Sequence, residues 1–89
     1  MKATKIKMIA ECTDSNSTQE IDSIYLDIAE SYWKKETVYD YLIAYPDSIR
    51  VNLYPYPFLK PIKNVYGEKY VRSAPSDIPI DNLLLLPRE

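Results

Sequence analysis

The sequence contains no histidine, and Cys12 is its only cysteine. Histidine is the commonest general base near neutral pH and the commonest ligand of transition metals, so its absence argues against acid–base catalysis and against a metal centre. A single cysteine excludes an internal disulfide, and nothing in the composition marks an oxidising compartment. We therefore predict a protein that is not an enzyme and has no catalytic residues, no cofactor and no metal ligands.

Glycine and long apolar runs are also scarce. Gly67 is the only glycine, which excludes a glycine-rich phosphate-binding loop. No apolar run approaches the roughly 18–20 residues of a membrane span. The first residues lead into an alternating pattern and do not resemble the apolar region of a signal peptide. The sequence therefore predicts a cytoplasmic protein that does not contact a membrane.

What the sequence does contain is typical of a small folded protein. Its 89 residues suit one domain spanning residues 1–89, and 46% of them are apolar. Nine tyrosines supply nearly all the aromatic content. A formal net charge of −2 gives no strong field toward nucleic acid or anionic lipid.

The hydrophobic periodicity predicts strands and one helix. Alternating apolar residues favour strands at residues 4–11, 20–28, 49–54, 62–66 and 68–73, the last two flanking a turn at Gly67. The proline-rich stretch 55–61 is predicted to be an extended edge or a connecting loop, because proline cannot donate to a central ladder.

One amphipathic helix is expected at residues 34–45, where apolar side chains recur at helical spacing and Pro46 ends the pattern. Trp33 should pack close to the helix start. The predicted order is β-β-α-β-β-β followed by a short C-terminal helical turn. This order indicates an α+β fold in which one helix covers an antiparallel sheet of four to five strands.

The chain ends in a run of four leucines. Asp81 is the predicted N-cap of a helical turn that carries them. Leu83 and Leu86 lie three residues apart on one side of that turn, so they should close the core. Leu84 and Leu85 then point elsewhere and are the candidates for contact with a partner protein.

The expected core combines the apolar faces of these elements. Its predicted members are Ile6, Met8, Ile24, Leu26, Trp33, Val38, Tyr41, Leu42, Val51, Leu53, Val71, Leu83 and Leu86.

The loop at residues 12–19 carries polar side chains that permit two interpretations. Cys12 as a nucleophile is disfavoured because the neighbouring acids Glu11 and Asp14 raise the pKa of its thiol. Asp14, Asn16 and Glu20 offer oxygen ligands, yet the loop lacks the glycine and the spacing of a calcium-binding loop. A solvated loop between two strands is the favoured interpretation.

Basic and aromatic residues accumulate in the second half of the chain. Strand alternation places Arg50 and Tyr54 on one face of one strand, and Tyr70 and Arg72 on one face of another. If these faces coincide, the sheet combines aromatic rings for stacking with cations for phosphates, as in proteins that bind single-stranded nucleic acid. An ordinary solvated sheet face is the competing interpretation.

Tyrosine also favours protein recognition, because it offers a large contact area with few rotatable bonds. The five tyrosines at positions 32, 39, 54, 56 and 66 cannot all be interior in so small a domain. We therefore expect a small cytoplasmic, non-enzymatic binding or protein-interaction module, whose partner is another protein or a second copy. The alternative is a nucleic-acid-binding accessory protein that uses the basic, tyrosine-rich face.

The C-terminal third carries a more specific pattern. Lys69-Tyr70-Val71-Arg72-Ser73 is followed by a polar stretch and then by Asn82, Leu83, Leu86 and Pro87. With the preceding tryptophan and helix, this pattern resembles the small bacterial family of domains of unknown function numbered three-eight-nine-two. The resemblance extends from about residue 21 to the C-terminus and implies no activity, substrate or partner.

Overall fold

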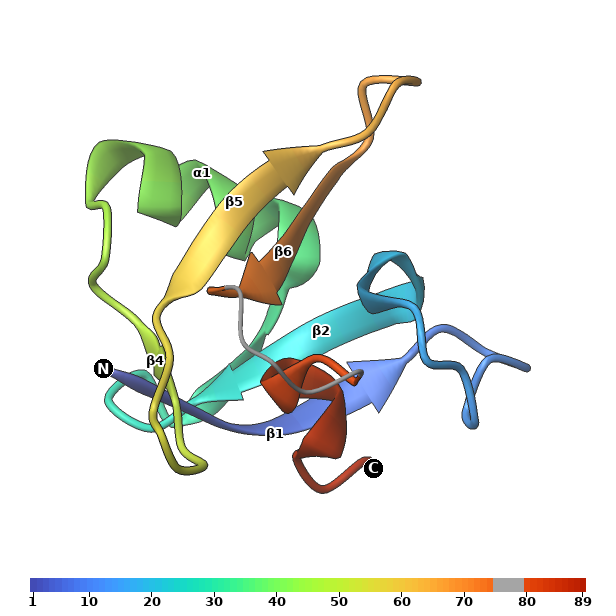
Figure 1. The fold of residues 1–89 in the computed structure, drawn as a ribbon, viewed down its shortest axis with the longest axis horizontal. Helices are drawn as coiled ribbons and strands as arrows, with labels where there is room; N and C mark the ends of the chain where they lie inside the picture. Colours follow the sequence, from blue (N-terminus) through green and yellow to red (C-terminus); the bar gives the residue numbers. More distant parts are fainter. Residues whose placement is uncertain (75–79) are drawn as a thin grey trace.

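The computed structural model describes residues 1–74 and 80–89, and it confirms the predicted α+β class with one α-helix and two sheets (Figure 1). The elements are β1 (Lys2–Met8), η1 (Thr18–Glu20), β2 (Ile21–Leu26), β3 (Ser31–Lys34), α1 (Lys35–Ala44), β4 (Arg50–Val51), β5 (Leu59–Lys63), β6 (Lys69–Ser73) and η2 (Asn82–Leu85), where η denotes a 3₁₀ helix. No helix among these residues has the length and apolar character needed to cross a membrane.

The larger sheet has the strand order β3-β2-β1-β4. β1 pairs with β2 and β2 with β3 in antiparallel fashion, whereas β4 runs parallel to β1. The prediction of a single antiparallel sheet is therefore wrong. An extra residue in β1 between Ala3 and Lys5 shifts the alternation, so that Ala3 and Ile6 are both buried although they lie three residues apart.

β3 was missed by the sequence pattern, which placed Trp33 in the approach to the helix. The four residues of β3 pair with β2, and Trp33 lies opposite Ile24. The Trp33 ring packs edge-to-face against Tyr41 of α1, with 5.7 Å between centroids. Because β3 needs residues 27–30 for its turn, β2 ends at Leu26, and the predicted extension of that strand to residue 28 is wrong.

The predicted strand at residues 49–54 is reduced to the two residues of β4. Pro55 and Pro57 cannot donate to a ladder, and Tyr56 has a left-handed φ of 59°, so the chain turns here. Residues 57–59 then lie alongside β4. Val51 N donates to Pro57 O, and Leu59 N donates to Ile49 O.

β5 and β6 form a separate antiparallel hairpin. β5 begins earlier than predicted and includes Pro61. The N–H of Leu59 points away from β6, toward Ile49 O, and the alternation of the ladder turns the Pro61 nitrogen to the same side. Pro61 therefore removes no bond between the two strands. Gly67 has the predicted left-handed conformation, with φ of 80°.

α1 covers the inner side of this hairpin and lies behind it in Figure 1. Val38 and Leu42 are buried as the helical pattern predicts, and Tyr41 is half-buried against the core. Tyr45, the last member of the predicted stripe, is exposed because the helix ends at Ala44.

The core lies between the larger sheet, the hairpin, α1 and η2. Nine predicted members are buried, and the other four, Met8, Trp33, Tyr41 and Leu53, pack half-buried against them. The buried apolar residues that the prediction omitted are Ala3, Ile21, Ile49, Leu59 and Leu84.

The C-terminal turn is a 3₁₀ helix capped as predicted, with the Asp81 carboxylate accepting from Leu83 N. Leu83 and Leu86 are buried, as expected. Leu84 is only 3% exposed, so its assignment to an exposed partner contact is wrong. η2 contacts both β1 and β6. Leu85 remains 51% exposed.

Candidate binding surface

The outer side of the β5–β6 hairpin carries two cross-strand pairs. Lys60 lies opposite Arg72, and Ile62 lies opposite Tyr70. Three of the residues that alternate with them along the strands, Leu59, Val71 and Ser73, are buried on the inner side. We call the four outward residues the hairpin face.

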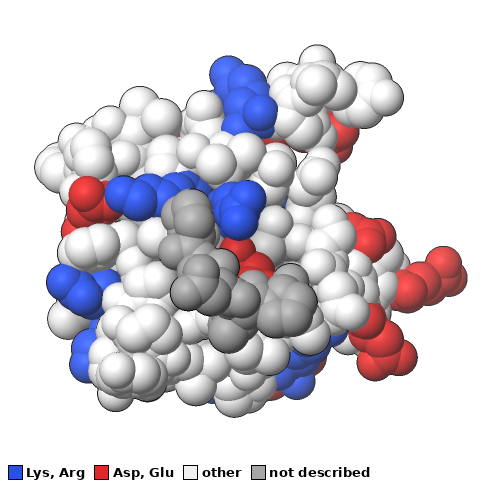
Figure 2. All heavy atoms as spheres, in the orientation of Figure 1, with Lys and Arg blue, Asp and Glu red and all other residues white. Residues whose placement is uncertain are grey.

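The Lys60–Arg72 pair places two cations side by side, an arrangement that destabilises a sheet when it is uncompensated. Each cation has its own carboxylate from outside the hairpin: Lys60 forms an ion pair with Asp47, and Arg72 Nε lies 3.8 Å from Asp81. Figure 2 shows Lys and Arg side chains gathered over the hairpin on this side of the molecule. The cations are therefore held in place and remain partly accessible to solvent.

The four predicted binding residues are only partly brought together. Tyr70 and Arg72 share the hairpin face. Arg50 lies at one end of the hairpin face. Its guanidinium stacks on the ring of Phe58, 4.0 Å from the ring centroid, and Phe58 immediately precedes β5. Tyr54 is 84% exposed in the loop between β4 and β5, where its nearest aromatic neighbour is Tyr56. The prediction that Arg50 and Tyr54 share one face of a regular strand is therefore wrong.

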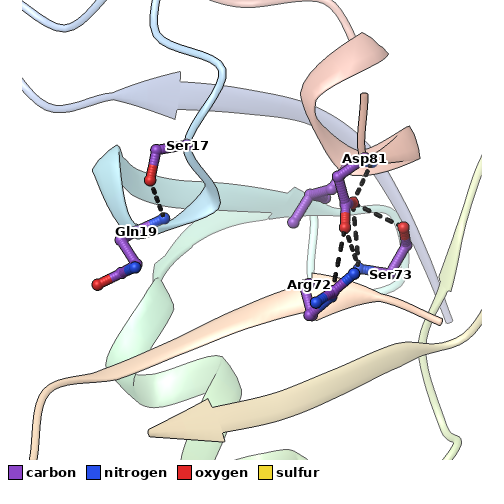
Figure 3. A network of polar contacts seen from close by, with 6 residues as sticks. Ser17, Gln19, Arg72, Ser73 and Asp81 are labelled. Carbon is purple, nitrogen blue, oxygen red and sulfur yellow. Dashed lines mark hydrogen bonds and ion pairs between the residues drawn. The ribbon is translucent and has the colours of Figure 1, made fainter. Parts of the chain in front are cut away.

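Asp81 attaches the base of the hairpin to the C-terminal segment (Figure 3). Its carboxylate accepts from Ser73 N at 3.1 Å and from Ser73 Oγ at 2.6 Å, in addition to the capping bond from Leu83 N at 3.0 Å. Ser73 is buried, so these bonds satisfy donors that water does not reach. The same carboxylate that compensates Arg72 therefore holds β6 against η2.

The tip of the hairpin, which projects from the body of the molecule in Figure 1, exposes two large apolar side chains. Val65 is 93% exposed and Tyr66 is 85% exposed. Asn64 organises the turn beneath them: its Oδ1 accepts from the backbone N–H groups of Tyr66 and Glu68, and its O accepts from Gly67 N. These bonds fix the backbone of the tip without using the Val65 and Tyr66 side chains.

A second basic and aromatic face lies on the outer side of the larger sheet, and the sequence pattern did not reveal it. Lys5 stacks on Tyr25 and Lys7 on Tyr32, at 4.4 and 4.5 Å from the ring centroids. Burial, reinforced by a hydrogen bond to Glu89, raises the pKa of Tyr32 to about 12. The lysine chains cover the rings here, so this face offers little free aromatic surface for stacking.

The pKa of the Cys12 thiol is raised, which is the direction that the sequence predicts, but the main cause is Glu20, with Glu11 the smallest cause and Asp14 not among them. The Cys12 Sγ donates to Glu20 Oε2 at 2.9 Å, and this bond to a carboxylate, together with desolvation, raises the pKa of the thiol. A raised pKa reduces the thiolate fraction and with it the nucleophilicity. Residues 1–74 and 80–89 contain no group of three or more Cys, Asp or Glu side chains arranged to hold a metal ion.

The hairpin face could have been found from the sequence if the turn had been placed correctly. A connection centred on Gly67 pairs the wrong residues, whereas the structure uses residues 64–68 as the connection. Asn64, whose side chain can accept from backbone N–H groups two and four residues ahead, was the available signal.

The fold defines a small α+β domain with a projecting hairpin. No protein-family model, no curated protein and no solved structure matches the chain. Membership of the family that the C-terminal pattern resembles therefore stays a prediction.

Proposed function

We propose that this protein is a non-enzymatic protein-interaction module and that the β5–β6 hairpin is its contact surface. The observation that carries the proposal is the exposure of Val65 and Tyr66 on a turn that Asn64 already holds in place. A few large side chains account for most of the affinity at a protein interface, as their truncation shows, and tyrosine is among the commonest of them. A preformed turn also reduces the conformational entropy lost on binding.

The hairpin face defines the chemistry of the partner. Lys60 and Arg72 favour acidic side chains, and the adjacent Ile62 and Tyr70 favour an apolar contact. The proposed partner therefore presents an apolar pocket for the tip with acidic residues beside it.

Two observations favour a protein over nucleic acid. The hairpin face carries two cations, Lys60 and Arg72, which is enough to contact one or two acidic side chains but too few to neutralise a run of successive phosphates. Tyr54, the most exposed tyrosine of the predicted nucleic-acid face, lies on the β4–β5 loop and not on the strands that carry Tyr70 and Arg72.

Site-specific photo-cross-linking in the native host tests the proposal. A photoreactive phenylalanine analogue at the position of Tyr66 should yield one dominant protein adduct, and Val65→Ser should reduce it. The same analogue at the position of Ile43, an exposed apolar residue on α1, is the matched control and should not yield that adduct. With the purified partner, Lys60→Gln combined with Arg72→Gln should weaken binding about tenfold, equivalent to about 1.4 kcal/mol.

The outcomes separate the two functions. Identical adducts from the Tyr66 and Ile43 positions would show that the tip is not a specific contact. A nuclease-sensitive adduct, with binding to a single-stranded oligonucleotide that falls steeply with salt, would overturn the proposal in favour of nucleic acid.

A further inference from the structure

Two cations converge on the loop between β4 and β5. Lys2 of β1 and Arg50 of β4 are partners in the parallel register, so their side chains leave neighbouring strands on the same side of the sheet. Arg50 Nη1 donates to Tyr56 O at 3.3 Å, and its guanidinium stacks on the ring of Phe58. Lys2 Nζ lies 5.9 Å from the centroid of the Tyr56 ring. Both cations therefore lie beside Tyr56.

Neither cation forms an ion pair within residues 1–74 and 80–89. Asp27 lies beside Lys2, but its Oδ1 accepts from two backbone N–H groups, that of Lys2 and that of the residue after Asp27. Asp47, which precedes β4, forms its ion pair with Lys60. Both of these carboxylates are therefore engaged in other contacts.

The cation pairs of the hairpin show the contrast, because like charges side by side destabilise a sheet. The Lys60–Arg72 pair has a carboxylate for each cation and the Lys63–Lys69 pair has one carboxylate, whereas the Lys2–Arg50 pair has none. An anion from another molecule would supply the missing charge. Arg50 can receive it, because a guanidinium carries several N–H donors and the Tyr56 carbonyl takes one.

The loop presents aromatic surface next to these cations. Tyr54 is 84% exposed, and its ring meets that of Tyr56 edge-to-face with 6.2 Å between centroids. Tyr56 has a left-handed φ of 59°, which is costly for a bulky side chain and recurs where a chain positions a ligand. The strained backbone therefore holds Tyr56 beside both cations, and Tyr54 leaves an aromatic ring open to solvent.

We propose that Lys2, Arg50 and Tyr54 bind a phosphate monoester that carries an aromatic group. A phosphate monoester has a charge between about −1.5 and −2 at pH 7, which matches two cations better than the single charge of a carboxylate does. The guanidinium can donate to two phosphate oxygens at once, and the Tyr54 ring can pack against the aromatic group. A nucleoside monophosphate and a phosphotyrosine side chain share this chemistry.

This site does not depend on the proposed function. The β4–β5 loop precedes β5 and the hairpin tip follows it, so the two surfaces lie at opposite ends of that strand (Figure 1). Failure of one proposal therefore leaves the other standing.

Chemical-shift titration of the full chain with phenyl phosphate tests the site. We expect saturable shifts at the backbone amides of Arg50, Tyr54 and Tyr56. Phenyl sulfate has a similar shape and a smaller charge, so it should bind about threefold more weakly, the effect of one exposed ion pair. Inorganic phosphate lacks the ring and should also bind more weakly than phenyl phosphate.

Three substitutions of exposed side chains separate the contributions. Lys2→Gln and Arg50→Gln should each raise the dissociation constant of phenyl phosphate by about threefold, again the effect of one exposed ion pair. Tyr54→Ala should weaken the binding of phenyl phosphate and leave that of inorganic phosphate unchanged.

Lys7→Gln is the matched control for Lys2→Gln. Lys7 is also exposed, also lies over a tyrosine ring and also forms no ion pair among the described residues, but it lies near the other end of β1. It should leave the affinity unchanged. The absence of shifts at millimolar phenyl phosphate would overturn the proposal. Equal losses from Lys2→Gln and Lys7→Gln, or phenyl sulfate binding as tightly as phenyl phosphate, would overturn it as well.

Two further probes identify the source of the ester. Tighter binding of adenosine monophosphate than of a phosphotyrosine peptide would assign the site to nucleotides, and the reverse order would assign it to a phosphorylated protein. Either order supports the shared chemistry. Weaker binding of both probes than of inorganic phosphate would overturn it.

Discussion

Replacing Asp81 with alanine tests how the hairpin is attached to the rest of the fold. The Asp81 side chain is 11% exposed and accepts from three donors on two different segments. Asp81→Ala removes the cap of η2 and leaves the N–H and hydroxyl of buried Ser73 without their acceptor. Both effects act on the contact between β6 and the C-terminal segment.

The structure sets the size of the effect. Loss of an aspartate N-cap costs about 1 kcal/mol. Loss of hydrogen bonds to a charged acceptor, with the buried donors left unpaired, costs about 1.5–3 kcal/mol. The contact with Arg72 adds little further, because it spans 3.8 Å and the arginine side chain is 48% exposed. We therefore expect Asp81→Ala to lower the free energy of unfolding by about 3 kcal/mol.

Urea denaturation measures this change. The midpoint should fall while the slope with denaturant stays constant, because the surface exposed on unfolding is unchanged. Asp81→Asn keeps one acceptor oxygen and should cost less than the alanine variant. Asp14→Ala, in an exposed loop, is the control and should change stability by under about 0.5 kcal/mol. A loss below about 1 kcal/mol for Asp81→Ala would refute the role assigned to this carboxylate.

Three further predictions follow from burial and from shifted pKa values. Leu84→Ala should cost about 2–5 kcal/mol in denaturant unfolding and Leu85→Ala under about 1 kcal/mol; equal losses would contradict the assigned burial. Because the pKa of Tyr32 rises from 10.0 to about 12, its stabilising contribution is complete below pH 10 and is lost as the pH rises toward 12. Ultraviolet titration should show a late step that Tyr32→Phe removes; its persistence would assign it to another ring. Glu20→Gln should lower the pKa of the Cys12 thiol and speed its alkylation at fixed pH, and an unchanged rate would exclude Glu20 as the cause.

Local sequence pattern predicted those elements whose stability depends on their own residues. The helix was placed to within one residue at each end, because apolar residues at helical spacing and a terminating proline are both local signals. The Asp81 cap and the conformation of Gly67 were predicted for the same reason. Each of these features is specified within a few residues of chain.

Features that depend on distant partners were predicted less well. β3 is a strand because β2 lies beside it, and four residues are too few to show a period of their own. β4 was predicted as one long strand, yet its parallel pairing with β1 extends over two residues before the prolines turn the chain. Leu84 appeared free because a single helical turn was assumed to pack against one neighbour, whereas η2 contacts both β1 and β6.

The candidate surface illustrates the same division. The sequence alone determined that the chain lacks histidine, has one glycine and is rich in tyrosine, and so favoured a binding protein. Only the tertiary structure decided which side chains face solvent together, because the cross-strand register brings Lys60 to Arg72 and Ile62 to Tyr70. Composition and local periodicity specify chemistry and short-range geometry. The pairing of strands that are far apart in the chain specifies which of those side chains share a surface.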